Sequence, residues 1–272
     1  MRTATRAAYA ERIARVQSFI SDHLDDDLDL DALAELACLS PFHFHRIYRS
    51  MTGETLAGTL RRLRLHRAAG QLIAGRVAIA RVAAGAGYGS VTAFRRAFQA
   101  CYRATPATYR ASAARATLPA VTIGRQPALV VAAIRHQGPY MEIGRAFERL
   151  ISWAAGHGLL AARPRSFGIY FDDPQSKPAS QLRSAAALLV PGGGALAAGM
   201  EWLAIAGGRY AEVEFRGPYA ELERAYRGLY GVWLPGSGEE AADGPCVEEY
   251  LNDPRKHLPS DWLTAVRLPL MA

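Results

Sequence analysis

Two stretches of this sequence place basic and polar side chains directly behind a helix-capping serine. Ser40 precedes Pro41, and Ser90 follows a turn from Gly87 to Gly89, so each serine is suited to cap the first turn of a helix. On the outward side of the first helix we expect Phe42, His45, Arg46 and Arg49. On the outward side of the second helix we expect Val91, Thr92, Arg95 and Arg96. Such helices fit the major groove of DNA, where arginine binds guanine edges or phosphates and apolar groups contact thymine methyls.

A second chemical pattern is a pair of carboxylates near the C-terminus, Glu248 and Glu249. A carboxylate in an apolar cleft attracts a cation, and each aromatic face nearby adds about 0.5–2 kcal/mol through cation–π contact. Strand alternation groups Glu248 with Tyr250 on one face and Glu249 with Leu251 on the other, but it does not say which glutamate faces the groove. The candidate aromatic walls are Tyr140, Tyr170, Trp202, Tyr219, Trp233 and Tyr250. The ordinary alternatives are two solvated glutamates and aromatic residues that serve only the core.

The sequence contains little that suggests metal, cofactor or catalytic chemistry. Cys38, Cys101 and Cys246 are far apart and form no CxxC pair, so neither a disulfide framework nor a zinc ribbon is indicated. The acidic run at residues 25–31 lacks the glycine and distal glutamate of a calcium loop and is better explained as helix capping. No GxSxG or HExxH motif occurs. We therefore expect no metal, no cofactor and no catalytic residue.

Length and hydropathy predict a two-domain protein. The chain has 272 residues, of which 50% are hydrophobic, enough for two cores of ordinary size. No apolar run approaches the roughly 20 residues of a membrane span, and the first residues do not have the layout of a signal peptide. We expect a soluble, cytoplasmic protein without a membrane partner.

Charge separates the two halves of the chain. Residues 1–118 carry seventeen arginines and nine acids, whereas the remainder is close to neutral although the whole chain has a net charge of +7. Between residues 38 and 118 there are thirteen arginines and one acid, Glu54. A basic field accelerates encounter with polyanions and releases counterions on binding. A solvated basic surface is the simpler explanation, but here the field coincides with both capped helices, which favours DNA binding.

The N-terminal half reads as helical throughout. Apolar spacing predicts a helix over residues 7–23, and aspartates at 29 and 31 are suited to cap the next one. A long helix over residues 54–74 links the two helix–turn–helix patterns as a strut, and Gly75 ends it. We predict an all-α double helix–turn–helix domain at residues 8–112, followed by a linker of small residues at 113–119.

The C-terminal half contains an internal repeat. The segment from Gly138 to Leu150 matches that from Gly217 to Leu229 at seven of thirteen positions, and both begin Gly-Pro-Tyr. Strand-like runs precede each copy, at 128–135 and 209–215, and follow the first copy at 167–172 and 185–190. Duplicated strand–helix–strand units predict a pseudo-symmetric α+β domain over residues 120–271, with a groove between its halves.

The N-terminal half resembles the DNA-binding domain of the AraC/XylS transcription regulators. The motifs that carry this resemblance are Gly87-Tyr88, the run from Phe94 to Phe98, and the run from Thr105 to Arg110. By motif position, the family's DNA contacts fall on Phe42, His45 and Arg46 in the first unit. In the second unit they fall on Val91, Thr92, Arg95 and Arg96, with valine where many members have a polar residue.

The C-terminal half resembles the GyrI-like effector-binding domain. This resemblance rests on both Gly-Pro-Tyr copies, on Ile169 to Pro174, on Trp233 to Pro235, and on Glu248 to Pro254. It implies binding of bulky, often cationic or aromatic small molecules by a carboxylate among aromatic rings, and Glu248 matches the binding glutamate. The combination with an AraC-type reader is typical of Rob-like regulators.

The combined prediction is a multidomain DNA-binding transcription regulator that is not an enzyme and whose C-terminal domain senses a small, lipophilic or cationic aromatic effector. The expected partners are double-stranded DNA, that effector, and RNA polymerase as a further candidate. An alternative is a GyrI-like hydrolase of reactive small molecules fused to a DNA-binding domain, with Glu248 acting beside Tyr170 or Tyr250. An interaction module that titrates another protein is a further alternative, and it predicts no saturable binding of small molecules.

Overall fold

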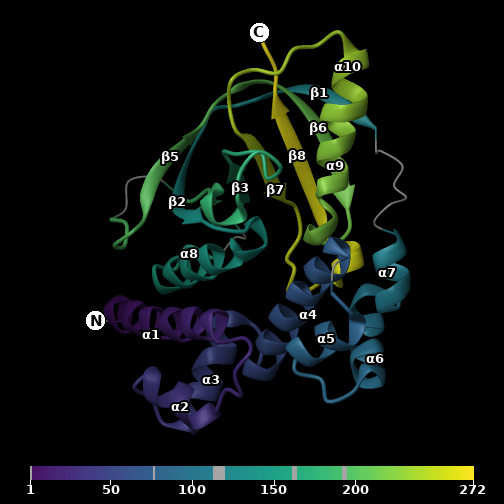
Figure 1. The fold of residues 1–272 in the computed structure, drawn as a ribbon. Coiled ribbons are helices and arrows are strands. Elements are labelled where there is room, and N and C mark those ends of the chain that lie inside the picture. Colours follow the sequence, from purple (N-terminus) through teal and green to yellow (C-terminus); the bar gives the residue numbers. More distant parts are fainter. Residues whose placement is uncertain (1, 76, 113–119, 161–163, 192–194) are drawn as a thin grey trace.

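The computed structural model describes residues 2–75, 77–112, 120–160, 164–191 and 195–272. Figure 1 shows a helical N-terminal half below a C-terminal half that is built on a curled sheet. The predicted linker at residues 113–119 lies outside the described residues. The all-α and α+β halves agree with the predicted fold class. No helix in the described ranges is long and apolar enough to cross a membrane.

The N-terminal half consists of helices joined by short turns. They are α1 (Arg2–Asp22), α2 (Leu30–Leu36), α3 (Pro41–Thr52), α4 (Leu56–Ala74), α5 (Ile79–Gly85), α6 (Val91–Tyr102) and α7 (Pro106–Ser112). Helix α1 begins before the predicted residue 7. Helices α2 and α3 form the first helix–turn–helix unit, and α5 and α6 form the second.

The predicted capping residues act as expected. The Ser40 hydroxyl accepts a hydrogen bond from the backbone amide of His43, and that of Ser90 accepts one from Ala93. Asp29 caps α2 in the same way, which confirms the capping role of the acidic run. Each cap satisfies an amide that the first helical turn leaves without a partner, a contribution of about 1 kcal/mol.

Helix α4 belongs to the cores of both helix–turn–helix units. Its residue Leu56 is buried with Phe44 and Tyr48 of α3, while its Leu65 and Leu72 are buried with residues of α5 and α6. Three arginines of this helix bind other groups of the protein. Arg64 donates to the carbonyls of Leu24 and Asp26, Arg67 pairs with Asp25, and Arg62 pairs with Glu54. The bonds of Arg64 and Arg67 tie the strut to the loop between α1 and α2, and the pair of Arg62 with Glu54 ties it to the turn before α4.

The described strands of the C-terminal half form one antiparallel sheet. They are β1 (Val121–Gln126), β2 (Leu129–Gln137), β3 (Ser166–Tyr170), β4 (Arg183–Leu188), β5 (Glu201–Ile205), β6 (Gly208–Arg216), β7 (Cys246–Tyr250) and β8 (Leu263–Pro269). Their order across the sheet is β1-β6-β8-β7-β3-β4-β2-β5. The runs predicted as strands correspond to β2, β3, β4 and β6, with ends that differ by a few residues.

The strand order shows the predicted pseudo-symmetry. Reading inward from either edge, β1 corresponds to β5, β6 to β2, β8 to β4 and β7 to β3. In each repeat a helix follows the long strand along the chain. Helix α8 (Gly144–Gly156) follows β2 in the first repeat, and α9 (Glu223–Gly228) follows β6 in the second. Helix α9 continues through a π-helical turn, Leu229–Trp233, into α10 (Leu234–Ser237). The first strand of each repeat pairs with the other repeat, so the two halves are interlocked.

The two halves of the chain meet along α1 and α8, which lie side by side in Figure 1. A Cβ added at Gly156 would lie 2.6 Å from the Cβ of Ala10, so glycine permits this close approach. Arg145 forms an ion pair with Asp22 at 2.7 Å, and the Ser152 hydroxyl donates to Gln17 at 2.6 Å. Helix α8 of the C-terminal half thus rests directly on the first helix of the N-terminal half.

Candidate effector cavity and nucleic-acid interface

A cavity of about 1490 Å³ lies where the two repeats meet. The neighbouring strands β3 and β7 form its floor, and helices α8 and α9 contribute its walls. The floor residues are Tyr170, Cys246, Glu248 and Tyr250. Sites for small molecules typically measure roughly 300–1000 Å³, so this cavity has room for a bulky ligand.

Glu248 is the buried carboxyl on the cavity floor. Its exposed fraction is 3%. The Tyr226 hydroxyl donates to Oε1 and the Tyr250 hydroxyl to Oε2, each at 2.9 Å, while the Tyr170 hydroxyl lies 2.8 Å from that of Tyr250. Both carboxyl oxygens are therefore held in fixed positions, with aromatic rings around them.

Burial raises the pKa of Glu248 to about 7, although the hydroxyls of Tyr226, Tyr250 and Tyr170 oppose that rise by stabilising the charged form. Burial and the nearby carboxylate also raise the pKa of these tyrosines well above the usual value, so they remain neutral donors. A cation placed in the cavity would favour the ionised carboxylate.

Gly168 makes room for this arrangement. It pairs with Glu248 across β3 and β7. A Cβ at this position would lie 2.6 Å from the Tyr250 hydroxyl oxygen and 2.7 Å from the Tyr170 ring. Any larger residue would push the rings away from the floor, so glycine allows both tyrosines to lie against the sheet.

The structure decides between the two glutamates. Glu249 lies on the other face of β7, where it receives hydrogen bonds from Arg165 at 2.6 Å and from Arg267 at 2.7 Å. Burial raises its pKa, but the two arginines outweigh that effect and the net shift is downward. Glu249 is thus a structural ion-pair partner, whereas Glu248 faces the cavity.

Of the predicted aromatic walls, Tyr140, Tyr170, Tyr219 and Tyr250 line the cavity. The Tyr140 hydroxyl donates to the carbonyl of Asp172 at 2.6 Å, which fixes its ring edge-on to that of Tyr170. Trp202 and Trp233 are not among the residues that line the cavity. Trp202 lies on edge strand β5, opposite Ala132, and Trp233 is partly buried against the core between α9 and the sheet. We therefore remove both tryptophans from the candidate site.

Sequence reasoning missed two cavity residues from the helices, Phe147 and Tyr226. They occupy the same position in the two repeats. Tyr226 also lies seven residues after Tyr219, on the same side of the helical segment, and this spacing was an available signal. Tyr226 carries a hydroxyl that Phe147 lacks, so the pseudo-symmetric cavity has one polar end.

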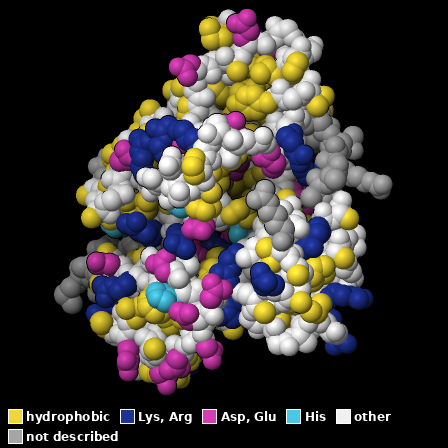
Figure 2. All heavy atoms as spheres, viewed as in Figure 1, with side chains coloured by type: hydrophobic (Ala, Val, Ile, Leu, Met, Phe, Trp, Pro, Cys, Tyr) yellow, Lys and Arg dark blue, Asp and Glu magenta, His cyan; other side chains and the backbone are white. Residues whose placement is uncertain are grey.

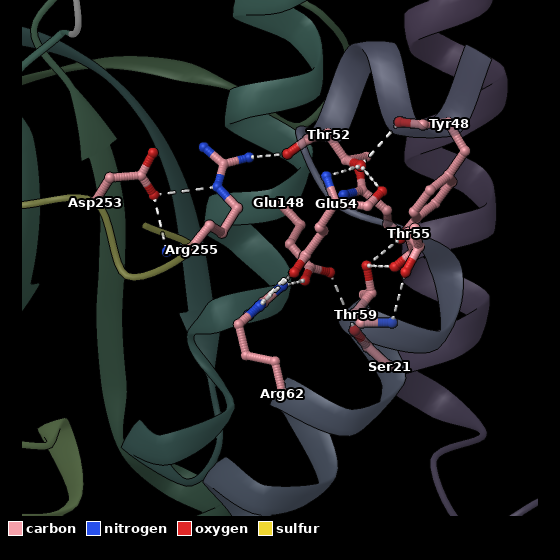
Figure 3. A network of polar contacts seen from close by, with 12 residues as sticks. Ser21, Tyr48, Thr52, Glu54, Thr55, Thr59, Arg62, Glu148, Asp253 and Arg255 are labelled. Carbon is pink, nitrogen blue, oxygen red and sulfur yellow. Dashed lines mark hydrogen bonds and ion pairs between the residues drawn. The ribbon is translucent and has the colours of Figure 1, made fainter. Parts of the chain in front are cut away.

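Part of the cavity wall comes from the DNA-binding half. The contributing residues are Gln17 of α1, Glu54 from the turn before α4, and Arg62, Leu63 and His66 of α4. Figure 3 shows Arg62 reaching both Glu54 and Glu148 of α8, with nitrogen–oxygen distances of 2.6 and 3.6 Å. Ser21 of α1 donates to the same Glu148 at 3.2 Å. No local sequence pattern indicated this contribution.

The residues expected to contact DNA are exposed on α3 and α6. The exposed fraction is 64% for Phe42 and 44% for Val91. The other six are exposed as well: His45, Arg46, Arg49, Thr92, Arg95 and Arg96. The opposite side of each helix is fully buried, through Phe44 in α3 and through Phe94 and Phe98 in α6. Each helix therefore turns the expected residues toward solvent.

Both exposed helices lie at the end of the molecule away from the sheet (Figure 1). The Arg46 guanidinium lies 4.6 Å from the centre of the Phe42 ring, which holds the two side chains together. On the face drawn in Figure 2, acidic side chains gather at the bottom of the α2–α3 lobe, whereas basic side chains mark the α5–α6 lobe. On this face the two lobes thus differ in charge.

Comparison with known families assigns both halves. The family model of the GyrI-like small-molecule-binding domain matches residues 119–271, which is more than half of the chain. The chain belongs to the GyrI-like family. A helix–turn–helix domain of the AraC type matches residues 33–112. This GyrI-like chain is therefore a DNA-binding transcription regulator that carries a small-molecule-sensing domain, as the sequence predicted.

Curated relatives resemble one half or the other. A DNA gyrase inhibitor of Edwardsiella piscicida is 33% identical over 144 residues, which cover 51% of this chain and 89% of that protein. The regulatory protein SoxS of Escherichia coli strain K12 is 32% identical over 93 residues, or 34% of this chain and 87% of SoxS. The crystal structure of the EcmrR C-terminal domain, 18% identical, covers 57% of this chain and 99% of that chain with a TM-score of 0.47.

Within the described ranges, no group of three or more His, Cys, Asp and Glu residues is placed to hold a metal ion. On the cavity floor, the polar chemistry is that of the Glu248 carboxyl beside the neutral hydroxyls of Tyr170, Tyr226 and Tyr250.

Proposed function

We propose that the effector is a lipophilic cation, which binds in the cavity with Glu248 as its counter-ion. The observation that carries this proposal is a carboxyl that is 97% buried and yet lines a cavity of about 1490 Å³ among aromatic rings. Tyr140, Tyr170, Tyr219 and Tyr250 supply ring faces, to which we add Tyr226 and Phe147.

The physical reason for cation preference is the high cost of an unpaired buried charge. Among the described residues no cation pairs with the Glu248 carboxylate, and burial raises its pKa to near neutrality. A bulky cation with delocalised charge loses little hydration on entry, and it gains both the ionic contact and the cation–π contacts of the walls. A small, strongly hydrated cation gains the ionic contact but fills little of the apolar cavity.

For DNA, we propose that α3 and α6 enter the major groove and contact it through the exposed residues. These are Phe42, His45, Arg46 and Arg49 in α3, and Val91, Thr92, Arg95 and Arg96 in α6. Support comes from their exposure, from the AraC-type match, and from the basic surplus of residues 38–118. We propose RNA polymerase as a further partner, since a regulator bound at a promoter alters transcription by affecting polymerase access or recruitment.

We propose that Glu248 binds the effector rather than catalysing a reaction. Two tyrosine hydroxyls already donate to its oxygens, an arrangement that stabilises a carboxylate as a fixed counter-ion. The hydrolase alternative requires the same carboxyl to activate water or an electrophile. Incubating the chain with an activated ester or an epoxide and following product release tests this assignment directly.

The main experiment measures binding of tetraphenylphosphonium to the full chain by calorimetry, beside the neutral triphenylphosphine oxide. We expect saturable binding of the cation and much weaker binding of the oxide. Glu248→Gln preserves the shape of the side chain and removes the charge, so cation affinity should fall by about tenfold or more.

The matched control is Asp243→Asn, which removes a carboxylate at the exposed rim of the same cavity. Solvent screens that charge, so cation affinity should change by less than about threefold. Equal losses in the two variants would indicate a general electrostatic field rather than a specific counter-ion. Undiminished affinity in Glu248→Gln would reject the proposal.

A further inference from the structure

We propose that the effector binds against both domains at once, with Leu63 and His66 of α4 forming one wall of its site. This inference rests on the proposed function, because it concerns the same cavity. It adds a specificity-determining surface from outside the GyrI-like domain. It also gives the effector a direct contact with the helix that joins the two DNA-reading units.

The first argument is continuity of the cavity surface from α4 to the carboxyl. The His66 ring lies 6.1 Å from the Tyr219 ring and 6.1 Å from the Trp262 ring, measured between centres. The Tyr219 ring lies 5.0 Å from that of Tyr250, whose hydroxyl bonds to Glu248. A row of rings therefore runs from the DNA-binding half to the cavity floor, and a bulky aromatic cation seated at Glu248 lies along this row.

The second argument is the chemistry of His66. Burial and the nearby Arg62 lower its pKa to about 4, so the imidazole is neutral at physiological pH. A neutral ring presents an aromatic face and does not repel a cation. Its Nδ1 is buried without a hydrogen-bond partner among the described residues, an unusual cost for a purely structural side chain. A ring that serves as a binding surface accounts for that cost.

The third argument is the position of α4 in the DNA-binding half. On its other sides, the same helix is part of the cores that hold α3 and α6. A group that presses on Leu63 or His66 thus acts on the element that fixes the spacing between the two reading units. Any change in this spacing alters DNA affinity, and reciprocity requires that DNA alters effector affinity by the same factor.

The ion pairs of Arg62 in Figure 3 indicate that the α4 wall of the cavity can respond to an effector. Arg62 binds Glu54 of its own half at 2.6 Å but reaches Glu148 of α8 only at 3.6 Å. Burial raises the pKa of Glu148 despite Arg62, so this link across the domain boundary is weak. The α4 wall is therefore held less firmly by α8 than by its own domain.

The test uses the full chain and tetraphenylphosphonium. His66→Trp extends a ring into the cavity from the α4 side and should weaken the cation about tenfold through steric overlap. The matched control is Gln71→Trp, on the same helix but not among the residues that line the cavity. It should leave the affinity unchanged.

A photoreactive analogue, (4-azidobenzyl)triphenylphosphonium, tests the same point on the unmodified chain. After irradiation, peptide mapping should find the label on residues 62–67 as well as on residues of the GyrI-like domain. Competition by tetraphenylphosphonium should remove both labels.

The outcomes separate this inference from the proposed function. If Glu248→Gln weakens the cation while His66→Trp does not, and the label is confined to residues 120–271, the shared site is wrong and the effector cavity stands. If the wild-type chain shows no saturable binding, or if Glu248→Gln binds the cation as tightly as the wild type, both the proposed function and the shared site are overturned. Loss in His66→Trp but not in Gln71→Trp, together with a label on α4, establishes the shared site.

Discussion

The hydroxyl of Tyr226 lies 2.9 Å from Oε1 of Glu248 and joins α9 to the middle of the sheet. The bond places a neutral donor from the second repeat on a carboxyl whose other oxygen is held by its own strand. Burial favours the neutral form more strongly than the tyrosine donors favour the charged form, so the pKa of Glu248 is raised to about 7. Cation binding is expected to be sensitive to either effect.

Removing this hydroxyl should weaken cation binding. In Tyr226→Phe the carboxylate loses one donor, so the pKa of Glu248 should rise by about one unit and less of it should be ionised at pH 7. Tetraphenylphosphonium affinity should fall several-fold. Tyr230→Phe is the matched control, since Tyr230 lines the same cavity but bonds to Cys246 instead. Equal affinities in the two variants would contradict the role assigned to Tyr226.

Cation affinity should also rise with pH. The folded-state pKa of Glu248, about 7, lies above the unfolded value of 4.5, so the free cavity is largely protonated at pH 6 and ionised at pH 8. The cation binds the ionised form, and affinity should increase about tenfold between these pH values, with proton release on binding near pH 6.5. The same raised pKa makes ionisation costly for folding, so stability should decline as pH rises from about 4.5 to 7. Glu248→Gln should abolish the pH dependence of cation affinity and make the decline in stability smaller, and a pH-independent affinity in the wild type would refute the assignment.

Arg46 and Arg96 should contribute to the preference for one DNA sequence over another, and not merely to the electrostatic attraction to DNA. A duplex selected by the chain from a random pool is compared with an unrelated duplex. Each arginine-to-alanine change should cost about 1–3 kcal/mol on the selected duplex and less on the other. Arg125→Ala on β1, an exposed arginine of the GyrI-like half, is the control and should affect neither. Equal losses on both duplexes would reduce the two arginines to phosphate contacts.

Replacing Arg62, the cation of the ion pair across the domain boundary, should destabilise the protein more than replacing its partner Glu148. In Arg62→Gln, two carboxylates that are largely buried, Glu54 and Glu148, lose their shared cation, and unfolding should become easier by about 3–5 kcal/mol. Glu148→Gln should cost much less, because burial already opposes its charge and the Ser21 bond survives. Urea unfolding followed by tryptophan fluorescence measures both. Similar losses would mean that Glu148 is bound more firmly than its 3.6 Å separation from Arg62 indicates.

Much of this fold was predictable from local signals. Ser40 and Ser90 marked the starts of both recognition helices because capping depends on residues only three positions away. The Gly-Pro-Tyr repeat predicted a duplicated α+β domain because each copy forms the same local unit. The strands β1, β5 and β8 were missed. Strands β1 and β5 each pair with the other repeat and have little pattern of their own. Pairing between distant segments leaves no local trace.

The site was predicted in part for similar reasons. Alternation along β7 grouped Glu248 with Tyr250 correctly, but only the folded sheet showed which face lines the cavity. Trp202 and Trp233 were placed in the site by residue type alone, which says nothing about where a side chain points. The contribution of His66 depends on how two domains meet, a relation that lies outside the sequence of either domain.

Linkage between the two sites tests the central claim most directly. The affinity of the full chain for tetraphenylphosphonium is measured without DNA and with a saturating amount of the selected duplex. The account predicts a change of about fivefold or more, and the cation must change DNA affinity by the same factor. Identical cation affinities in the presence and absence of DNA would contradict a regulator whose DNA-reading helices respond to the occupied cavity.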